Sequence, residues 1–256
     1  MIELITMPNK HSKLVNAIIF SLMGLFSWLI YLATCWGLAD LLAKPAAYQI
    51  SLWEQPNSIA KAAAWPTTLT QLQWAINLEP ANPDLLELIS RAYYLHSNFD
   101  IGIKLQLTSL QPALNYNLQA IRQRPVSAYT WANIALLKSQ LQQYDAQFET
   151  AITQAIILGK WEPLVQHFVI EAGLAAWYQL SQSTRWLVLA TIERGISLQP
   201  QLIKALINKY QRIYTLCAYL DLYKEHPGFA STFSIARQPA QLIQFCQQVN
   251  FGETKS

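Results

Sequence analysis

The chain has 256 residues, of which 52% are hydrophobic and 13% are charged, with 18 Lys and Arg against 15 Asp and Glu. This composition excludes a mostly disordered chain, because disorder requires low hydrophobicity and high net charge. Three cysteines are too few for a small protein built on disulfides. A net charge of +3 without a block of basic residues gives little support for nucleic-acid binding, so no nucleic-acid partner is expected.

Residues 14–39 form a long apolar segment without formal charge. As a helix the segment is roughly 39 Å long, which is enough to cross a hydrocarbon core of about 30 Å. Lys10 and Lys13 precede it, whereas Asp40 follows it. By the positive-inside rule we expect residues 1–13 in the cytoplasm and residues 45–256 on the other side of the bilayer. No second segment of comparable length follows, so a single-pass protein is predicted.

Two other interpretations of this segment are possible. A cleaved signal peptide has an apolar region of about 7–15 residues, and this segment is much longer, which favours an uncleaved transmembrane helix over 14–39. Residues 32–35 resemble a lipoprotein cleavage box, although Thr34 stands where such a box has Gly or Ala. After the membrane segment we expect a linker and a short helix over 40–65, with the helix at 59–65 ended by Pro66.

One short sequence recurs in the rest of the chain. AINLEP at 75–80 is followed by AIRQRP at 120–125, by AIILGKWEP at 155–163 and by GISLQP at 195–200. Each copy is predicted to close a helix, because a proline cannot continue one, and the terminal prolines are Pro80, Pro125, Pro163 and Pro200. Apolar residues at helical spacing follow each proline. We therefore predict an all-α domain.

The repeated unit resembles the tetratricopeptide repeat, a helix–turn–helix of about 34 residues. The best unit covers residues 127–158, where Trp131 and Ala135 occupy the large and small positions of the first helix. The predicted architecture is one transmembrane helix followed by a TPR-like superhelical repeat domain over 66–220 and a helical cap and tail over 221–256. Stacked units of this kind bury each other's apolar faces.

The inner helices of such an array line a concave groove. If Trp131 packs between helices, then Tyr129, Asn133, Leu136 and Gln140 face that groove, where Asn133 could hydrogen-bond a peptide backbone. A solvated helix face would have the same pattern, so the groove is a hypothesis.

Residues with catalytic potential are sparse. His167 and Glu171 lie four residues apart, but two ligands do not make a zinc site, and a polar pair on a helix surface is favoured. The sequence has no nucleophile elbow, phosphate-binding glycine loop or Cys-x-x-Cys motif. We expect a non-catalytic protein without metal or cofactor.

Cys217 and Cys246 both lie beyond the predicted membrane segment. A disulfide between them would close a loop of 29 residues and stabilise the fold by about 3 kcal/mol. Two buried free thiols are the alternative. Cys35 falls within the membrane segment.

Aromatic side chains offer a further hypothesis. Tyr93, Tyr94, Trp177 and Tyr178 could stack on sugar rings, but their helical spacing favours packing between helices.

A family resemblance is carried by RPVSAYTWANIALLK at 124–138, YDAQF at 144–148, GKWEP at 159–163 and EAGLAAW at 171–177. Together with the apolar segment, LEPANP at 78–83 and the Leu216-Cys217 pair, these residues resemble the VpsP family of bacterial exopolysaccharide-biosynthesis proteins. The resemblance spans most of residues 65–220. It implies a helical-repeat accessory protein in the bacterial inner membrane, with its C-terminal domain in the periplasm, and it brings no catalytic residue.

Three functional hypotheses follow. The first is a scaffold that binds membrane-embedded proteins of polysaccharide synthesis, polymerisation or export. The second is a carbohydrate-binding module that grips the nascent polymer through surface aromatics. The third is a sugar-modifying enzyme whose catalytic residues are brought together only by the fold.

Overall fold

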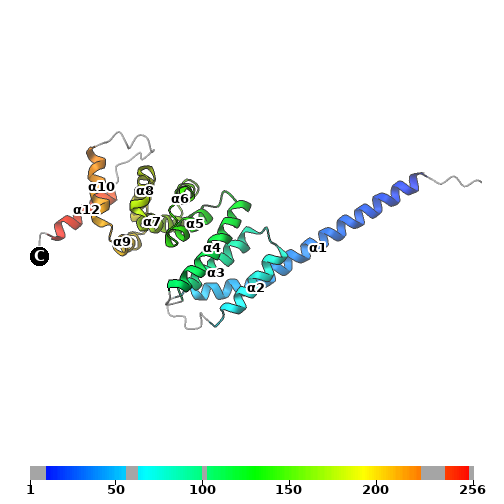
Figure 1. The fold of residues 1–256 in the computed structure, drawn as a ribbon. Coiled ribbons are helices and arrows are strands. Elements are labelled where there is room, and N and C mark those ends of the chain that lie inside the picture. The colour runs from blue at the N-terminus through cyan, green and yellow to red at the C-terminus, as the bar shows by residue number, and fades with distance from the viewer. Residues whose placement is uncertain (1–9, 56–62, 100–102, 226–239, 254–256) are drawn as a thin grey trace, which may run out of the picture.

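The computed structural model describes residues 10–55, 63–99, 103–225 and 240–253, and these residues form helices joined by short connections, with no strand among them. The N-terminal part of helix α1 (Lys10–Trp53) extends away from the other helices, which follow one another in chain order (Figure 1). The predicted all-α fold is confirmed, and so is a long apolar N-terminal helix.

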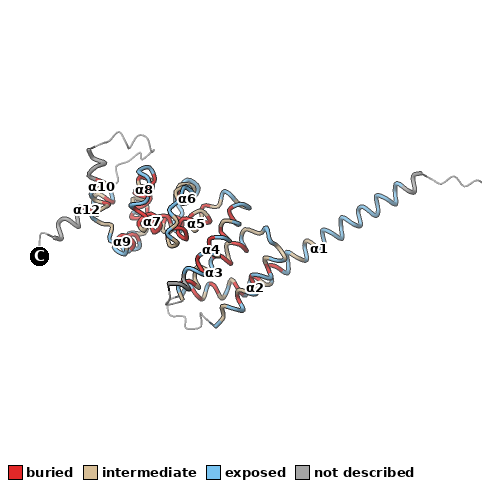
Figure 2. Tube along the Cα trace, in the orientation of Figure 1, coloured by how far each residue is buried: buried red, intermediate tan, exposed pale blue. Residues whose placement is uncertain are grey.

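The two ends of α1 have different surroundings. Side chains over residues 14–31 are exposed, and the helix has an 18-residue window with a mean hydropathy of 2.0 (Figure 2). From Ala39 onward, one face of α1 is buried against other helices. The part of the chain that the structure describes therefore contains one helix long and apolar enough to span a membrane.

The predicted linker over 40–65 differs from the structure. Helix α1 continues through Pro45 to Trp53, and its Ile50 and Trp53 share a buried cluster with Leu72 of α2 (Trp65–Leu78). Packing on this face keeps the segment helical although proline removes a backbone donor. Pro66 lies in the first turn of α2, where a missing N–H costs nothing. It therefore begins a helix, and residues 59–62 of the expected short helix lie outside the described residues.

From α2 to α9 each helix contacts the next, α5 also packs on α7 and α7 on α9, and α10 contacts α12. Their bounds are α3 (Pro83–Ser97), α4 (Ile103–Gln123), α5 (Ala128–Gln140), α6 (Ala146–Leu158), α7 (Pro163–Ala175), the 3₁₀ turn η1 (Trp177–Gln179), α8 (Gln182–Leu198), α9 (Pro200–Lys209), α10 (Ile213–Glu225) and α12 (Ala240–Glu253).

The repeated sequence folds into a repeated helix end. At each copy, the backbone N–H of the residue that ends the helix donates to the carbonyl of a small buried residue four positions earlier. The N···O distances are 3.0 Å for Glu79–Ala75, 3.0 Å for Arg124–Ala120, 2.9 Å for Gly159–Ala155 and 2.7 Å for Gln199–Gly195. The small residue thus lies where two helices approach closely, which explains why it recurs.

The four prolines do not occupy equivalent positions. Pro80 and Pro125 lie in the turns that follow α2 and α4, whereas Pro163 and Pro200 are the first residues of α7 and α9. Each copy of the repeated sequence ends a helix as predicted, and its proline lies either in the turn that follows or in the first turn of the next helix. The spacing between the starts of α3, α5, α7 and α9 is 45, 35 and 37 residues, from positions 83, 128, 163 and 200.

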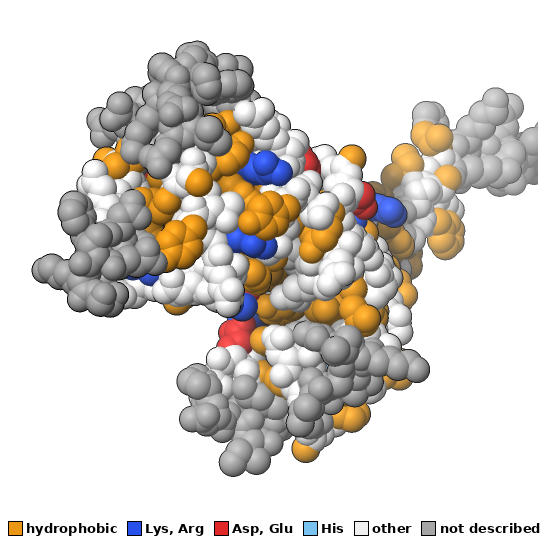
Figure 3. All heavy atoms as spheres, turned by 60° about the vertical axis from the view of Figure 1, so that its left-hand side comes forward, with side chains coloured by type: hydrophobic (Ala, Val, Ile, Leu, Met, Phe, Trp, Pro, Cys, Tyr) orange, Lys and Arg blue, Asp and Glu red, His pale blue; other side chains and the backbone are white. Residues whose placement is uncertain are grey.

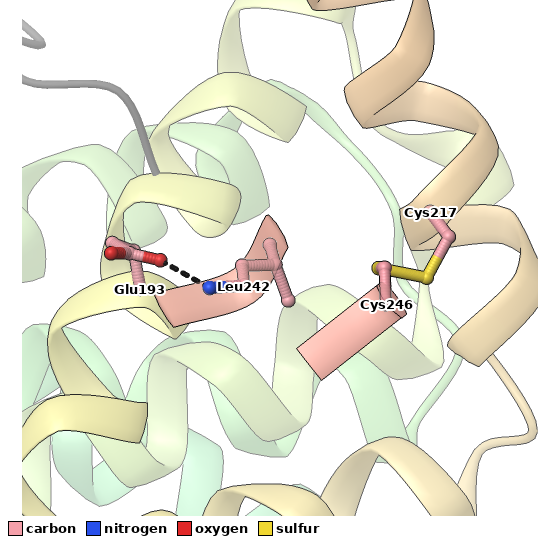
Figure 4. Close-up of a disulfide and its surroundings, with 4 residues drawn as sticks. All are labelled: Glu193, Cys217, Leu242 and Cys246. Carbon is pink, nitrogen blue, oxygen red and sulfur yellow. Dashed lines mark hydrogen bonds between the residues drawn. A yellow bond between two sulfur atoms is a disulfide. The ribbon is translucent and has the colours of Figure 1, made fainter. Parts of the chain in front are cut away.

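Helix α12 is attached to the series at two points. Cys246 forms a disulfide with Cys217 of α10, with the Cα atoms 5.6 Å apart (Figure 4). The Glu193 carboxylate of α8 accepts hydrogen bonds from the amides of Gln241 and Leu242 at 2.8 and 2.7 Å. Of the two alternatives that the sequence leaves open, the structure has the bridge. Residues 226–239 of the predicted cap lie outside the described residues.

Candidate binding groove

A cavity of about 230 Å³ lies among α3, α5 and α7, with Asn117 of α4 and Glu54, the residue after α1, also in its wall. The groove therefore lies between helices that are not consecutive in the chain. Its lining combines aromatic, polar and charged side chains, including Arg91, Tyr94, Tyr129, Asn133, Leu164 and Phe168.

Two of the four predicted groove residues line this cavity. Tyr129 and Asn133 lie one turn apart on α5 and both face it. Leu136 is buried, with 1% of its surface exposed, so the prediction that it faces the groove is wrong. Gln140 is not among the residues that line the cavity.

Trp131 packs against the main core, as the groove hypothesis requires. Its indole Nε1 donates to the carbonyl oxygen of Pro125 at 2.9 Å, which fixes the ring against the turn before α5. With Trp131 packed against the core, Tyr129 and Asn133 are the α5 residues of the prediction that face the groove.

The charged groups of the groove are paired. Arg91 of α3 forms an ion pair with Glu54, which directly follows α1. Glu87 accepts from Arg124 at 2.8 Å and from the hydroxyls of Ser127 and Thr130 near the start of α5. Its hydrogen bond to Glu87 raises the pKa of Arg124 above its usual value. The acidic side chains therefore join different elements of the fold, and the groove wall carries little unbalanced charge.

Asn117 of α4 leaves one acceptor unused at the groove wall. Its Nδ2 donates to Ser90 Oγ at 2.6 Å, and Ser90 in turn donates to the carbonyl of Ala113 at 2.8 Å. The Asn117 side chain is buried, and its Oδ1 has no hydrogen-bond partner. Buried acceptors are almost always satisfied, so a ligand N–H that reached this oxygen would remove an energetic cost.

A polar cluster continues from α7 to α9. Glu171 Oε1 accepts from Lys209 Nζ at 2.6 Å and from the Tyr210 hydroxyl at 3.2 Å, and Glu171 Oε2 lies 3.6 Å from His167 Nε2. The Glu171 carboxylate, which a metal ion would need as a ligand, is thus already paired with the ammonium group of Lys209. Within the described ranges no group of three or more His, Cys, Asp and Glu residues could hold a metal ion.

The four aromatic residues considered for sugar binding have different environments. Trp177 is buried, and Tyr93 contacts Trp65 and Tyr116. Tyr94 lines the groove. Tyr178 is 62% exposed, with the Arg212 guanidinium 4.5 Å from its ring centre.

Two further cation–π pairs join Lys204 with the ring of Phe245 and Arg194 with the ring of Trp161. In the view with the C-terminal helices in front, exposed hydrophobic side chains lie among Lys and Arg side chains (Figure 3).

Sequence reasoning missed Glu54, Glu87 and Arg91. The available signal was the spacing of opposite charges, because Glu54–Arg91 and Glu87–Arg124 are each 37 residues apart.

Comparison of the chain with protein-family models, with curated proteins and with solved structures finds no match.

Proposed function

We propose that the chain is a non-catalytic scaffold in the bacterial inner membrane. In this proposal α1 crosses the bilayer with its N-terminus in the cytoplasm, and the later helices form a TPR-like array in the periplasm. The array binds a protein of exopolysaccharide synthesis, polymerisation or export. The pathway rests on the resemblance to the VpsP family, and the binding role rests on the groove.

The exposed part of α1 supports the anchor. Its side chains over residues 14–31 are exposed around the whole helix, and they carry no charge. Soluble monomers rarely expose contiguous apolar patches larger than a few hundred Å². A lipid bilayer would cover this apolar surface. A helix is suited to that environment because its backbone polar groups hydrogen-bond to one another.

Three ion pairs with similar sequence separations support the repeat array. Glu171 and Lys209 are 38 residues apart, close to the 37 residues of the Glu54–Arg91 and Glu87–Arg124 pairs. In stacked repeats each unit contacts only its neighbours, so ion pairs join residues separated by about one repeat.

The composition of the groove carries the binding proposal. The rings of Tyr129 and Phe168 lie 5.9 Å apart and offer an apolar contact, while Asn133 and the unpaired Asn117 Oδ1 offer hydrogen bonds. A peptide segment supplies both a side chain and backbone N–H groups. Anchoring beside the partner raises its effective concentration, so a modest intrinsic affinity is sufficient.

A second candidate function, carbohydrate binding, is favoured by one observation. The exposed ring of Tyr178 is held from one side by Arg212, and its hydroxyl lies 3.2 Å from Thr215 Oγ1. A fixed aromatic ring beside a cation suits a sugar that carries an acidic group.

Genetic complementation tests the proposed function. Deletion of the gene is expected to reduce secreted polysaccharide, and the wild-type chain is expected to restore it. A chain with Tyr129→Ala and Asn133→Ala should fail to restore it, whereas Gln147→Ala, on the exposed surface of α6, should restore it. Unchanged polysaccharide after deletion would refute the pathway. Failure of Tyr178→Ala alone, with the groove variants active, would favour the carbohydrate-binding function.

A further inference from the structure

We infer that the C-terminal end of α2 is a second membrane contact, in which Trp74 lies in the phospholipid interface and seats the helical domain against the leaflet where α1 leaves the bilayer. This inference rests on the anchoring part of the proposed function. It extends the contact with lipid from one helix to the surface of the domain.

The end of α2 lies beside α1 at the level where the apolar segment ends. Ala39 and Ala43 of α1 form one buried cluster with Ala75 of α2 and Leu85 of α3. Asp40 is the first charged residue after the segment. Ala43 lies about 6 Å beyond Ala39 along the helix axis, and the polar interface of one leaflet is about 5–8 Å thick. The last turn of α2 is therefore at interface depth.

Trp74 lies outside the packed face of α2. The buried residues of this helix are Thr68, Leu72 and Ala75, whereas Trp74 is 61% exposed. A tryptophan ring is largely apolar but carries one N–H donor, so it is enriched where hydrocarbon meets headgroups. Trp36 of α1, 54% exposed, lies on the membrane side of Ala39 and marks the same interface.

Because α1 is continuous, a contact at Trp74 would affect the orientation of the whole domain relative to the membrane. The helix runs without a break from the membrane segment into the core of the domain, so no flexible linker separates them. One helix crossing a bilayer leaves the domain free to rotate about the helix axis and to tilt. A second contact at Trp74 restricts this motion and holds the groove at a defined height and direction above the membrane.

Depth measurements by spin labelling test the inference on the full chain. In a Cys35→Ala background, labels are placed at Gln73→Cys, next to Trp74, at Gln147→Cys on α6, and at Leu22→Cys within the membrane segment. The protein is reconstituted into vesicles of phosphatidylcholine and phosphatidylglycerol. Collision rates are measured with oxygen, which concentrates in the bilayer, and with a nickel chelate, which stays in water.

The oxygen-to-nickel collision ratio is expected to be several-fold higher at 73 than at 147, and to fall towards the value at 147 when Trp74→Asn is added. The matched change Trp161→Asn, at a ring that is 65% exposed elsewhere, should leave the ratio at 73 unchanged. A membrane-like ratio at 22 with equal ratios at 73 and 147 overturns the inference alone. A water-like ratio at 22 overturns the anchor itself. Low collision rates with both reagents at 73 show protein covering the site and overturn the lipid assignment.

Discussion

Gly173 of α7 packs directly against Val188 of α8. A Cβ atom at this position would lie 2.7 Å from Val188 Cγ2 and 2.8 Å from Cγ1, closer than real contacts allow. Gly173→Ala is therefore expected to lower the free energy of unfolding by about 1–3 kcal/mol, because a β-branched side chain inside the core cannot move away freely. Thermal unfolding in detergent measures the change. Gly37→Ala, where a Cβ meets no atom within 4 Å, is the control, and equal unfolding midpoints for the two variants would contradict the packing.

His167 makes stability depend on pH. Burial lowers the pKa of its imidazole below the usual 6.5, an effect that Glu171 opposes and Lys209 reinforces. The unfolded chain therefore binds a proton more readily, so stability is fully present above pH 6.5 and is lost as the pH falls towards the pKa of the folded state.

His167→Gln is expected to reduce the loss of stability between pH 7 and pH 5. Urea unfolding midpoints of the variant and the wild type at both pH values measure this loss. An equal loss in both proteins would show that other groups determine the acid sensitivity.

At the residue scale, the sequence identifies only part of the groove. Tyr129 and Asn133 follow from helical spacing on one helix, since α5 exposes a single face. The burial of Leu136 could not be predicted, because it lies on the same face and is covered by tertiary packing. Glu54 and Arg91 come from separate elements, which only the folded chain brings together.

Individual elements are joined by carboxylates at helix starts. Glu149 of α6 accepts from the amide and hydroxyl of Ser181 at 2.7 and 2.5 Å, and from the Thr184 hydroxyl at 2.6 Å, at the N-terminus of α8. Glu149→Ala would leave these donors without their acceptor and is expected to cost about 1–3 kcal/mol in chemical unfolding. Glu162→Ala, at a helix start where the side chain makes no capping bond, should cost less than about 0.5 kcal/mol. Equal costs would contradict this role.

The disulfide is expected to hold α12 on the array. Reduction removes the constraint on a 29-residue loop, which is worth about 3 kcal/mol by loop entropy. Hydrogen exchange should accelerate over 240–247 on reduction, while α5–α7 keep their protection. A Cys217→Ser, Cys246→Ser chain should show the fast exchange with or without reductant. If reduction left hydrogen exchange over 240–247 of the wild type unchanged, the hydrogen bonds to Glu193 and apolar packing would be enough to hold α12, and the disulfide would not be needed.

At the element scale, the helical secondary structure was easier to predict than the positions of the helix ends. Small residues four positions before each helix end are visible in the sequence as AINLEP and its copies. Proline positions are ambiguous, because Pro163 and Pro66 begin helices whereas Pro80 lies in a turn, and local sequence does not separate these cases. The extension of α1 through Pro45 depends on its packing against α2 and α3.

At the scale of the whole molecule, α1 belongs both to the membrane and to the domain. Its first part is a lipid-exposed helix in our proposal, and its last turns are core elements that pack on Leu72 and Ile89. The groove begins next to this junction, since Glu54 directly follows α1. A binding site built in this way lies close to the bilayer, where the partners that we propose are embedded.

Site-specific photo-cross-linking in intact membranes tests the central claim most directly. A benzophenone amino acid replaces Asn133 in the groove or Gln147 on α6 of the full chain. The account predicts a discrete protein adduct from position 133, lost when Tyr129→Ala is added, and no such adduct from position 147. The absence of a protein adduct at 133, or the same adduct from both positions, would contradict a scaffold that binds its partner in this groove.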